Sequence, residues 1–305
     1  MEYYFSLSYM KNLLFIINPV AGRRHARSAM FDVVHTFCKA GYNVTTAVTL
    51  ERGHGKQMAR DAAKNGYDLV VCIGGDGTLN EIISGLAESD NPLPLGYIPA
   101  GSTNDFARTL GLSLTPARAA ENITREIPKT LDIGSFNNGE RFFSYIASFG
   151  AFSAASYNAP QSAKNKFGHF AYVLEGINEI GKIHSYNITL KGDGKDYSGR
   201  YIFGAVSNTR SVGGIVKLKD DEVDLNDGLF EVTLIKRPFN YMDLQNIVMG
   251  ITTSNFDNKS FVHFQASHLD FQLSKAVPWT LDGEEANGGD HIVLDNLYKK
   301  ITIYK

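Results

Sequence analysis

The chain has few cysteines, little net charge and no long apolar run, and each absence excludes a class of protein. Two cysteines among 305 residues, Cys38 and Cys72, rule out a disulfide framework. We expect both to be packing residues in a reducing cytoplasm. A formal net charge of −2 gives no basic footprint for nucleic acid. No apolar run reaches about 18 residues, so we expect no membrane-spanning helix.

The most informative feature present is a glycine-rich segment between an apolar run and a helical pattern. Val70 to Ile73 are continuously apolar, as in a buried parallel strand, and GGDGTLN follows at Gly74–Asn80. Thr78 and Glu81 have the spacing of a capping box, which predicts a helix start at this point. Glycines let a backbone approach phosphates, and the N–H groups of a helix start bind them.

This segment is neither of the two common nucleotide motifs. Asn80 stands where G-x-G-x-x-G requires its last glycine, and the lysine of the nearest P-loop-like segment, Lys56, is followed by Gln57. Asp76 beside a polyphosphate is repulsive unless a divalent cation or a donor lies between them. The pattern therefore favours a metal–nucleotide loop. A plain strand-to-helix turn is the alternative.

Two further polar loops strengthen the first interpretation. NPVAG at Asn18–Gly22 follows the apolar strand Leu13–Ile17, and PAGSTND at Pro99–Asp105 follows Leu95–Ile98. In an open parallel sheet, ligands bind beyond the carboxyl ends of the strands. The three loops are therefore predicted to converge on one site.

The pattern of apolar residues changes near residue 130. Up to about Ile127, strands alternate with helical patterns, which predicts a parallel sheet with helices on both faces. Beyond it, strand-like segments dominate and predict a mainly antiparallel domain. The strand-like segments are 132–136, 141–148, 186–190, 201–206, 229–235, 261–265 and 269–273, and helical patterns lie at 167–180 and 241–251. We expect an α/β domain at 10–130 and a β-rich domain at 131–294.

Five motifs, spread in order over nearly the whole chain, carry a family resemblance: NPVAG, GGDGTLNE, PAGSTNDFAR, DLNDGLFEV at Asp224–Val232 and LDGE at Leu281–Glu284. With them the chain resembles the diacylglycerol kinase catalytic family, bacterial lipid kinases related to sphingosine kinases and, more distantly, to NAD kinases and phosphofructokinases. The resemblance implies an NAD kinase/phosphofructokinase-like α/β domain, and a last strand, at about 295–305, that returns to it.

The resemblance also implies a nucleotide site. Its residues by matching position are Asn18, Gly22, Thr49, Gly74, Gly75, Asp76, Gly77, Thr78, Leu79, Asn80, Ser102 and Thr103, with an acidic metal-linked network at Asp76, Asp105 and Asp132. From the residues alone, Thr49 could equally end a strand and Asp132 begin one.

A metal and a base are implied in the second domain. By matching position, Asp224, Asp227 and the carbonyl of Leu229 surround Mg2+, and Glu284 takes the proton of the acceptor hydroxyl. Read by themselves, DLNDG and LDGE are equally typical of turns. The chain departs from the family at Lys217–Val223, where KLKDDEV replaces an apolar stretch that contains proline.

The implied function is a cytoplasmic kinase that acts peripherally at the inner face of the membrane. It transfers the γ-phosphoryl of ATP to diacylglycerol and forms phosphatidic acid, with Asp227 and Glu284 as catalytic residues. Another lipid alcohol, a sphingoid base, or a non-catalytic ATP-binding role are the alternatives, and a homodimer stays open. One further segment combines basic and aromatic residues: Lys164, Lys166, Phe167, Phe170, Tyr172 and Lys182. Such a segment suits either contact with a membrane surface or an ordinary helix whose aromatic residues pack inward.

Overall fold

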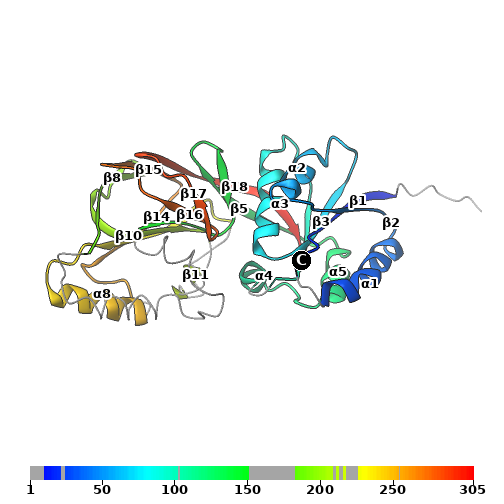
Figure 1. Ribbon diagram of the computed structural model, residues 1–305, viewed down its shortest axis with the longest axis horizontal. Helices are drawn as coiled ribbons and strands as arrows, with labels where there is room; N and C mark the ends of the chain where they lie inside the picture. Colours follow the sequence, from blue (N-terminus) through cyan, green and yellow to red (C-terminus); the bar gives the residue numbers. More distant parts are fainter. Residues whose placement is uncertain are drawn as a thin grey trace, which may run out of the picture. The chain divides into compact units, whose positions relative to one another are not determined.

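The computed structural model describes residues 10–21, 25–101, 104–150, 183–208, 211–212, 216–217, 226–253 and 255–305. The chain divides into two compact units (Figure 1). The N-terminal unit comprises Met1–Leu131 and Lys300–Lys305, and the C-terminal unit comprises Asp132–Lys299.

The N-terminal unit is a parallel sheet with helices on both faces. Its strands are β1 (Lys11–Ile17), β2 (Tyr42–Val48), β3 (Leu69–Gly74) and β4 (Leu95–Pro99), completed by the end of β18 (His291–Tyr304). Their order is β18-β4-β3-β1-β2. The helices are α1 (His25–Lys39), α2 (His54–Asp61), α3 (Asp76–Glu88), α4 (Asp105–Leu110) and α5 (Pro116–Ile123). The return of the last strand, which the resemblance implied, is present: Ile303 pairs with Leu95 in parallel.

Apolar residues on both faces explain this arrangement. All of β3 is buried, as expected for a central parallel strand covered on two sides. Val33 and Phe37 of α1 pack in one cluster with Ala120 and Ile123 of α5. Figure 1 shows α1 and α5 on one side of this sheet and α2 and α3 on the other.

The C-terminal unit is mainly antiparallel. Its strands are β5 (Pro128–Phe136, which begins in the N-terminal unit), β6 (Arg141–Phe143), β7 (Ile146–Gly150), β8 (Tyr186–Gly192), β9 (Lys195–Asp196), β10 (Gly199–Ser207), β11 (Ser211–Val212), β12 (Val216–Lys217), β13 (Phe230–Lys236), β14 (Phe261–Ala266), β15 (His268–Leu273), β16 (Trp279–Leu281), β17 (Glu284–Ala286) and most of β18. Helix α8 (Tyr241–Thr253) packs on β14, where a Cβ added at Gly250 would lie 2.4 Å from the ring of Phe261.

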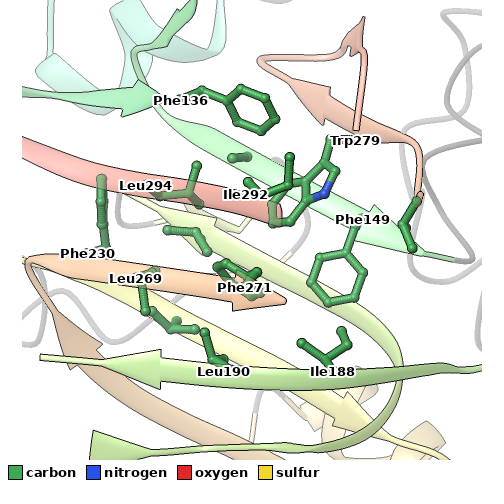
Figure 2. Packing of buried hydrophobic residues seen from close by; sticks show 14 of the residues in the cluster. Phe136, Phe149, Ile188, Leu190, Phe230, Leu269, Phe271, Trp279, Ile292 and Leu294 are labelled. Carbon is green, nitrogen blue, oxygen red and sulfur yellow. The ribbon is translucent and has the colours of Figure 1, made fainter. Parts of the chain in front are cut away.

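An aromatic cluster forms the core of this unit (Figure 2). The ring of Trp279 lies 4.9 Å from that of Phe149, 5.2 Å from that of Phe271 and 5.7 Å from that of Phe136. These rings come from four strands, two of them (β5 and β7) far in sequence from the other two (β15 and β16). Their packing fixes β16, and therefore the turn that follows it, against β7.

The predicted fold class is confirmed: a parallel α/β part is followed by an antiparallel part. The details differ at Arg141–Ser148, predicted as one strand, which is divided into β6 and β7 at Ser144 and Tyr145. The helical pattern at 167–180 lies outside the described residues. In the part of the chain that the structure describes, no helix is long and apolar enough to cross a membrane.

Candidate active site

The three predicted loops meet at one edge of the N-terminal sheet. Strand β3 pairs in parallel with both β1 and β4, so the three carboxyl ends lie together. The Asn18 N–H donates to the carbonyl of Ile73 at 3.1 Å, and the Ala100 N–H donates to that of Gly74 at 2.7 Å. Each loop is therefore bonded to the end of β3.

Two glycines are required by close contacts, one between two loops and one between the end of β3 and the start of α3. A Cβ on Gly101 would lie 2.7 Å from the Cα of Gly75, and one on Gly74 would lie 2.6 Å from the Cβ of Thr78. A Cβ on Gly77 would have no described atom within 4 Å. Packing therefore explains Gly74 and Gly101 but not Gly77.

Two asparagines hold the loops. The Nδ2 of Asn18 donates to the hydroxyl of Thr78 at 2.7 Å, and its Oδ1 accepts the Val20 N–H at 3.0 Å. Asn104 has a left-handed backbone with φ 50° and exchanges two hydrogen bonds with the backbone of Gly101, at 2.8 and 3.0 Å. The sequence motif contained Asn104, but spacing did not reveal its role as a clamp.

The predicted capping box is wrong. Helix α3 begins at Asp76 after an extended Gly75 that caps it without a side chain, so Thr78 already lies inside the first turn. The carboxylate of Glu81 instead accepts the Gly53 N–H at 2.9 Å. An N-terminus without a side-chain cap leaves backbone N–H groups for an anion. Asn80 is buried, and its Oδ1 accepts no hydrogen bond within the described chain.

The remaining predicted nucleotide residues are less informative. Both the N–H and the hydroxyl of Thr49 donate to the carbonyl of Ile17, at 2.9 and 3.4 Å, which extends the β1–β2 pairing. Its role toward a nucleotide stays a prediction. Gly22, Ser102, Thr103 and Asp224, and the side chain of Asp105, lie outside the described residues.

Asp132 anchors the candidate metal loop in the C-terminal unit. It is 1% exposed, and its carboxylate accepts the N–H groups of Gly228 and Lys299, both at 2.7 Å. Gly228 lies between Asp227 and Leu229, the two described candidate ligands. Asp132 therefore fixes the position of that loop through a backbone contact.

The loop residues fit a hard cation. Asp227 Oδ1 accepts the Leu229 N–H at 2.9 Å, which closes a tight turn around Gly228 at φ 82°. The carboxylate of Asp227 and the carbonyl of Leu229 are the oxygen donors that Mg2+ prefers. Within the described ranges, no three His, Cys, Asp or Glu side chains gather as a metal site, so other oxygen donors would have to complete the set.

The LDGE motif forms a tight turn between β16 and β17. Asp282 and Gly283 have φ values of 50° and 86°, as in a two-residue hairpin. The Asp282 carboxylate accepts four hydrogen bonds, from Ser144 N–H at 2.6 Å, Ser144 Oγ at 2.8 Å, Tyr145 N–H at 3.0 Å and Ile146 N–H at 2.9 Å. Burial raises the pKa of Asp282 to about 6 against the opposing effect of these donors. The turn is thereby fastened to the start of β7.

Glu284, the first residue of β17, is held by an arginine from another hairpin. Arg141 donates from one nitrogen to the carbonyl of Glu285 at 2.5 Å, and from another to Glu284 Oε2 at 3.4 Å. The side chain of Glu284 is 34% exposed, so its carboxylate is oriented and still reachable from solvent. No local pattern pointed to Arg141, because its contact with Glu284 spans 143 positions.

Comparisons with known proteins show which family the chain belongs to. The family model for the diacylglycerol kinase catalytic domain matches residues 12–136. The diacylglycerol kinase of Bacillus subtilis (strain 168) is 32% identical over 297 residues, covering 96% of each chain. The chain belongs to the diacylglycerol kinase family. It is therefore a kinase of a lipid-kinase family, and this membership implies that it uses ATP.

Other relatives extend the likeness. The diacylglycerol kinase of Staphylococcus aureus (strain MRSA252) is 31% identical over 275 residues, covering 90% of this chain and 86% of the relative. A crystal structure from Bacillus anthracis str. Sterne matches with a TM-score of 0.80 and 23% identity, covering 100% of this chain and 98% of the other. At that identity the structural match shows the fold alone.

Proposed function

We propose that this diacylglycerol kinase family member transfers the γ-phosphoryl of ATP to the hydroxyl of diacylglycerol and forms phosphatidic acid. The observation that carries the proposal is the way in which neighbouring residues hold the Glu284 side chain. A half-buried carboxylate that follows a turn fixed by Asp282, and is oriented by Arg141, is suited to accept a proton from a positioned hydroxyl. As the proton passes to Glu284, the hydroxyl oxygen bonds to the γ-phosphorus and ADP leaves.

The N-terminal unit supplies the nucleotide groups in this proposal. Backbone N–H groups at the start of α3 and in the loops after β1 and β4 bind the phosphates, and Asn18 keeps the first of these loops on Thr78. Phosphoryl transfer depends mainly on such positioning and on charge neutralisation. The described nucleotide residues are those predicted from the sequence, Asn18, Thr49 and Gly74–Asn80.

The C-terminal unit supplies the base and the oxygen ligands of a cation. Asp227 and the Leu229 carbonyl, on the loop that Asp132 anchors, hold Mg2+, with Asp224 added from the family pattern. Bound there, Mg2+ would neutralise phosphate charge during transfer. The lipid acceptor is assigned to this unit because Glu284 belongs to it.

We further propose that the protein works in the cytoplasm, peripherally at the inner face of the membrane. The segment Lys164–Lys182, expected to contact lipid, lies outside the described residues. Within the described residues, α8 and the segment just before it carry four exposed apolar side chains. Their exposed fractions are 78% for Phe239, 62% for Tyr241, 67% for Met242 and 63% for Met249. The Lys259 side chain, which follows α8 in sequence, is 75% exposed, and its Nζ lies 3.5 Å from Oδ1 of Asp243 in α8. Aromatic rings and lysines together suit anionic headgroups.

The test is transfer of labelled γ-phosphate from ATP, with Mg2+, into a panel that contains diacylglycerol, a monoacylglycerol, a sphingoid base and NAD. We expect label in phosphatidic acid with the wild type, and none above background with folded Glu284→Gln. Label in another lipid would keep the chemistry and replace the acceptor. ATP binding without transfer to any acceptor would favour the non-catalytic alternative, and full turnover by Glu284→Gln would show that the base is assigned wrongly.

A further inference from the structure

A buried amide oxygen in the C-terminal unit has no partner. Asn208, directly after β10, is 3% exposed, and its Oδ1 accepts no hydrogen bond within the described chain. Its other polar groups are bonded: the N–H donates to the Tyr145 carbonyl at 2.9 Å, and Nδ2 donates to the Asp132 carbonyl at 2.5 Å. An orphaned buried acceptor is destabilising, so a bound ligand would explain why it is present.

The orientation of this amide follows from its bond to Asp132. If the amide were turned over, Oδ1 would face the Asp132 carbonyl at 2.5 Å, and two acceptors would repel each other. Nδ2 therefore faces Asp132. Oδ1 points to a different neighbour, and none of the described residues supplies it.

The place of Asn208 in the hydrogen-bond network connects it to the candidate cation loop. Asp132 accepts Nδ2 of Asn208 through its carbonyl and the Gly228 N–H through its carboxylate. Gly228 is flanked by Asp227 and Leu229, so one residue links Asn208 to both ligands. Tyr145, which accepts the Asn208 N–H, donates its own N–H to Asp282 in the turn before Glu284.

We propose that Asn208 Oδ1 is a further oxygen ligand of the divalent cation that Asp227 and the Leu229 carbonyl hold in the proposed function, on which this inference rests. An amide oxygen is a hard, neutral donor of the kind that Mg2+ accepts beside carboxylates. It adds a ligand without adding negative charge near the nucleotide phosphates. It also explains why a polar atom is kept without a protein partner at a buried position.

Cation-dependent stability of the full chain without lipid or nucleotide tests the proposal. Thermal unfolding is followed in EDTA and during titration with MgCl2 or MnCl2, for the wild type, Asn208→Leu and Asn208→Asp. Both variants lose the Nδ2 bond to Asp132, so both should be less stable than the wild type in EDTA. Asn208→Leu removes the oxygen and should weaken cation affinity at least about tenfold. Asn208→Asp keeps an oxygen with added charge, so its affinity should equal or exceed that of the wild type.

Asn296→Leu is the matched control, because the side-chain oxygen and nitrogen of Asn296 are also buried without partners in the described chain. Its N–H donates to the Ser267 carbonyl at 2.8 Å, so its N–H is held by the residue between β14 and β15, outside the strand β5 that contains Asp132. Its cation affinity should match the wild type.

Three outcomes would overturn the inference. If the cation affinities of Asn208→Leu and the wild type agree, Oδ1 is no ligand. If Asn208→Leu and Asn208→Asp lose affinity equally, the residue acts only through its bond to Asp132. If the wild type itself shows no cation-dependent stabilisation, the metal loop fails with it, whereas the assignment of Glu284 is still decided separately by turnover of Glu284→Gln.

Discussion

Gly77 offers a test that separates the demands of the fold from those of the nucleotide. A Cβ at this position would meet no described atom within 4 Å, and the residue lies in the first turn of α3 without a positive φ. No contact within the described residues therefore requires a glycine there. Alanine in place of glycine stabilises a helix by about 0.5–1 kcal/mol.

The expected result of Gly77→Ala is a protein that is more stable and binds ATP less well. Unfolding in urea should show a gain of about 0.5 kcal/mol, at the lower end because the site is near the helix start. If phosphates approach the Gly77 backbone, the new methyl group must displace them. Isothermal calorimetry should then show ATP affinity reduced at least about tenfold, or 1.4 kcal/mol.

Gly74→Ala is the contrasting variant. Its Cβ would lie 2.6 Å from that of Thr78, so we expect stability itself to fall by about 1–3 kcal/mol. Wild-type ATP affinity in a stabilised Gly77→Ala protein would refute the reasoning, because it would show that the phosphates do not lie against this part of the loop.

Three further predictions concern the C-terminal unit. Burial raises the pKa of Asp282 from 3.8 to about 6, so between these pH values the folded state keeps a proton that the unfolded chain has lost. The free energy of unfolding of the wild type should therefore fall by up to about 3 kcal/mol as the pH rises from about 4 to about 6. Asp282→Asn should lack this slope. An identical slope in urea unfolding of both proteins would contradict it. Arg141→Lys keeps the charge but cannot donate to the Glu285 carbonyl and Glu284 together, so kcat should fall about tenfold with KM for ATP unchanged. A proportional rise in KM for ATP would instead show that Arg141 acts on nucleotide binding rather than on the orientation of Glu284. Phe239→Ser should reduce sedimentation with anionic vesicles about tenfold, whereas Phe31→Ser, equally exposed at 78%, should not; equal losses would exclude α8 as the contact.

The convergence of the three N-terminal loops was predictable because its determinants are local. Each loop follows its strand directly in sequence, and parallel pairing brings the loop starts together without long-range information. The error at Thr78 and Glu81 was also local: capping-box spacing was present, but the extended Gly75 caps the helix three residues earlier than Thr78 would. Glu81 was then left to bind the distant Gly53.

The supports of the second site could not be predicted, because they join distant segments. Asp282 binds Ser144 across 138 positions, and Asn208 binds Asp132 across 76. The LDGE motif identified a turn and a carboxylate, but not the residues at Ser144–Ile146 that donate hydrogen bonds to Asp282 in that turn. A local sequence pattern does not show which distant residue will form a hydrogen bond with a buried side chain.

Carboxylates of the C-terminal unit fall into two groups by what they bind, and the distinction predicts their mutants. Asp132, which is buried, and Asp282, which is partly buried, accept hydrogen bonds from backbone N–H groups. A buried N–H that loses its acceptor costs free energy whatever chemistry occurs nearby. Asparagine at these anchors should therefore lower stability and turnover together. The Glu284 carboxylate is oriented by the side chain of Arg141 and is 34% exposed, so Glu284→Gln should remove turnover while leaving unfolding almost unchanged. That combination is the signature of a residue kept for chemistry.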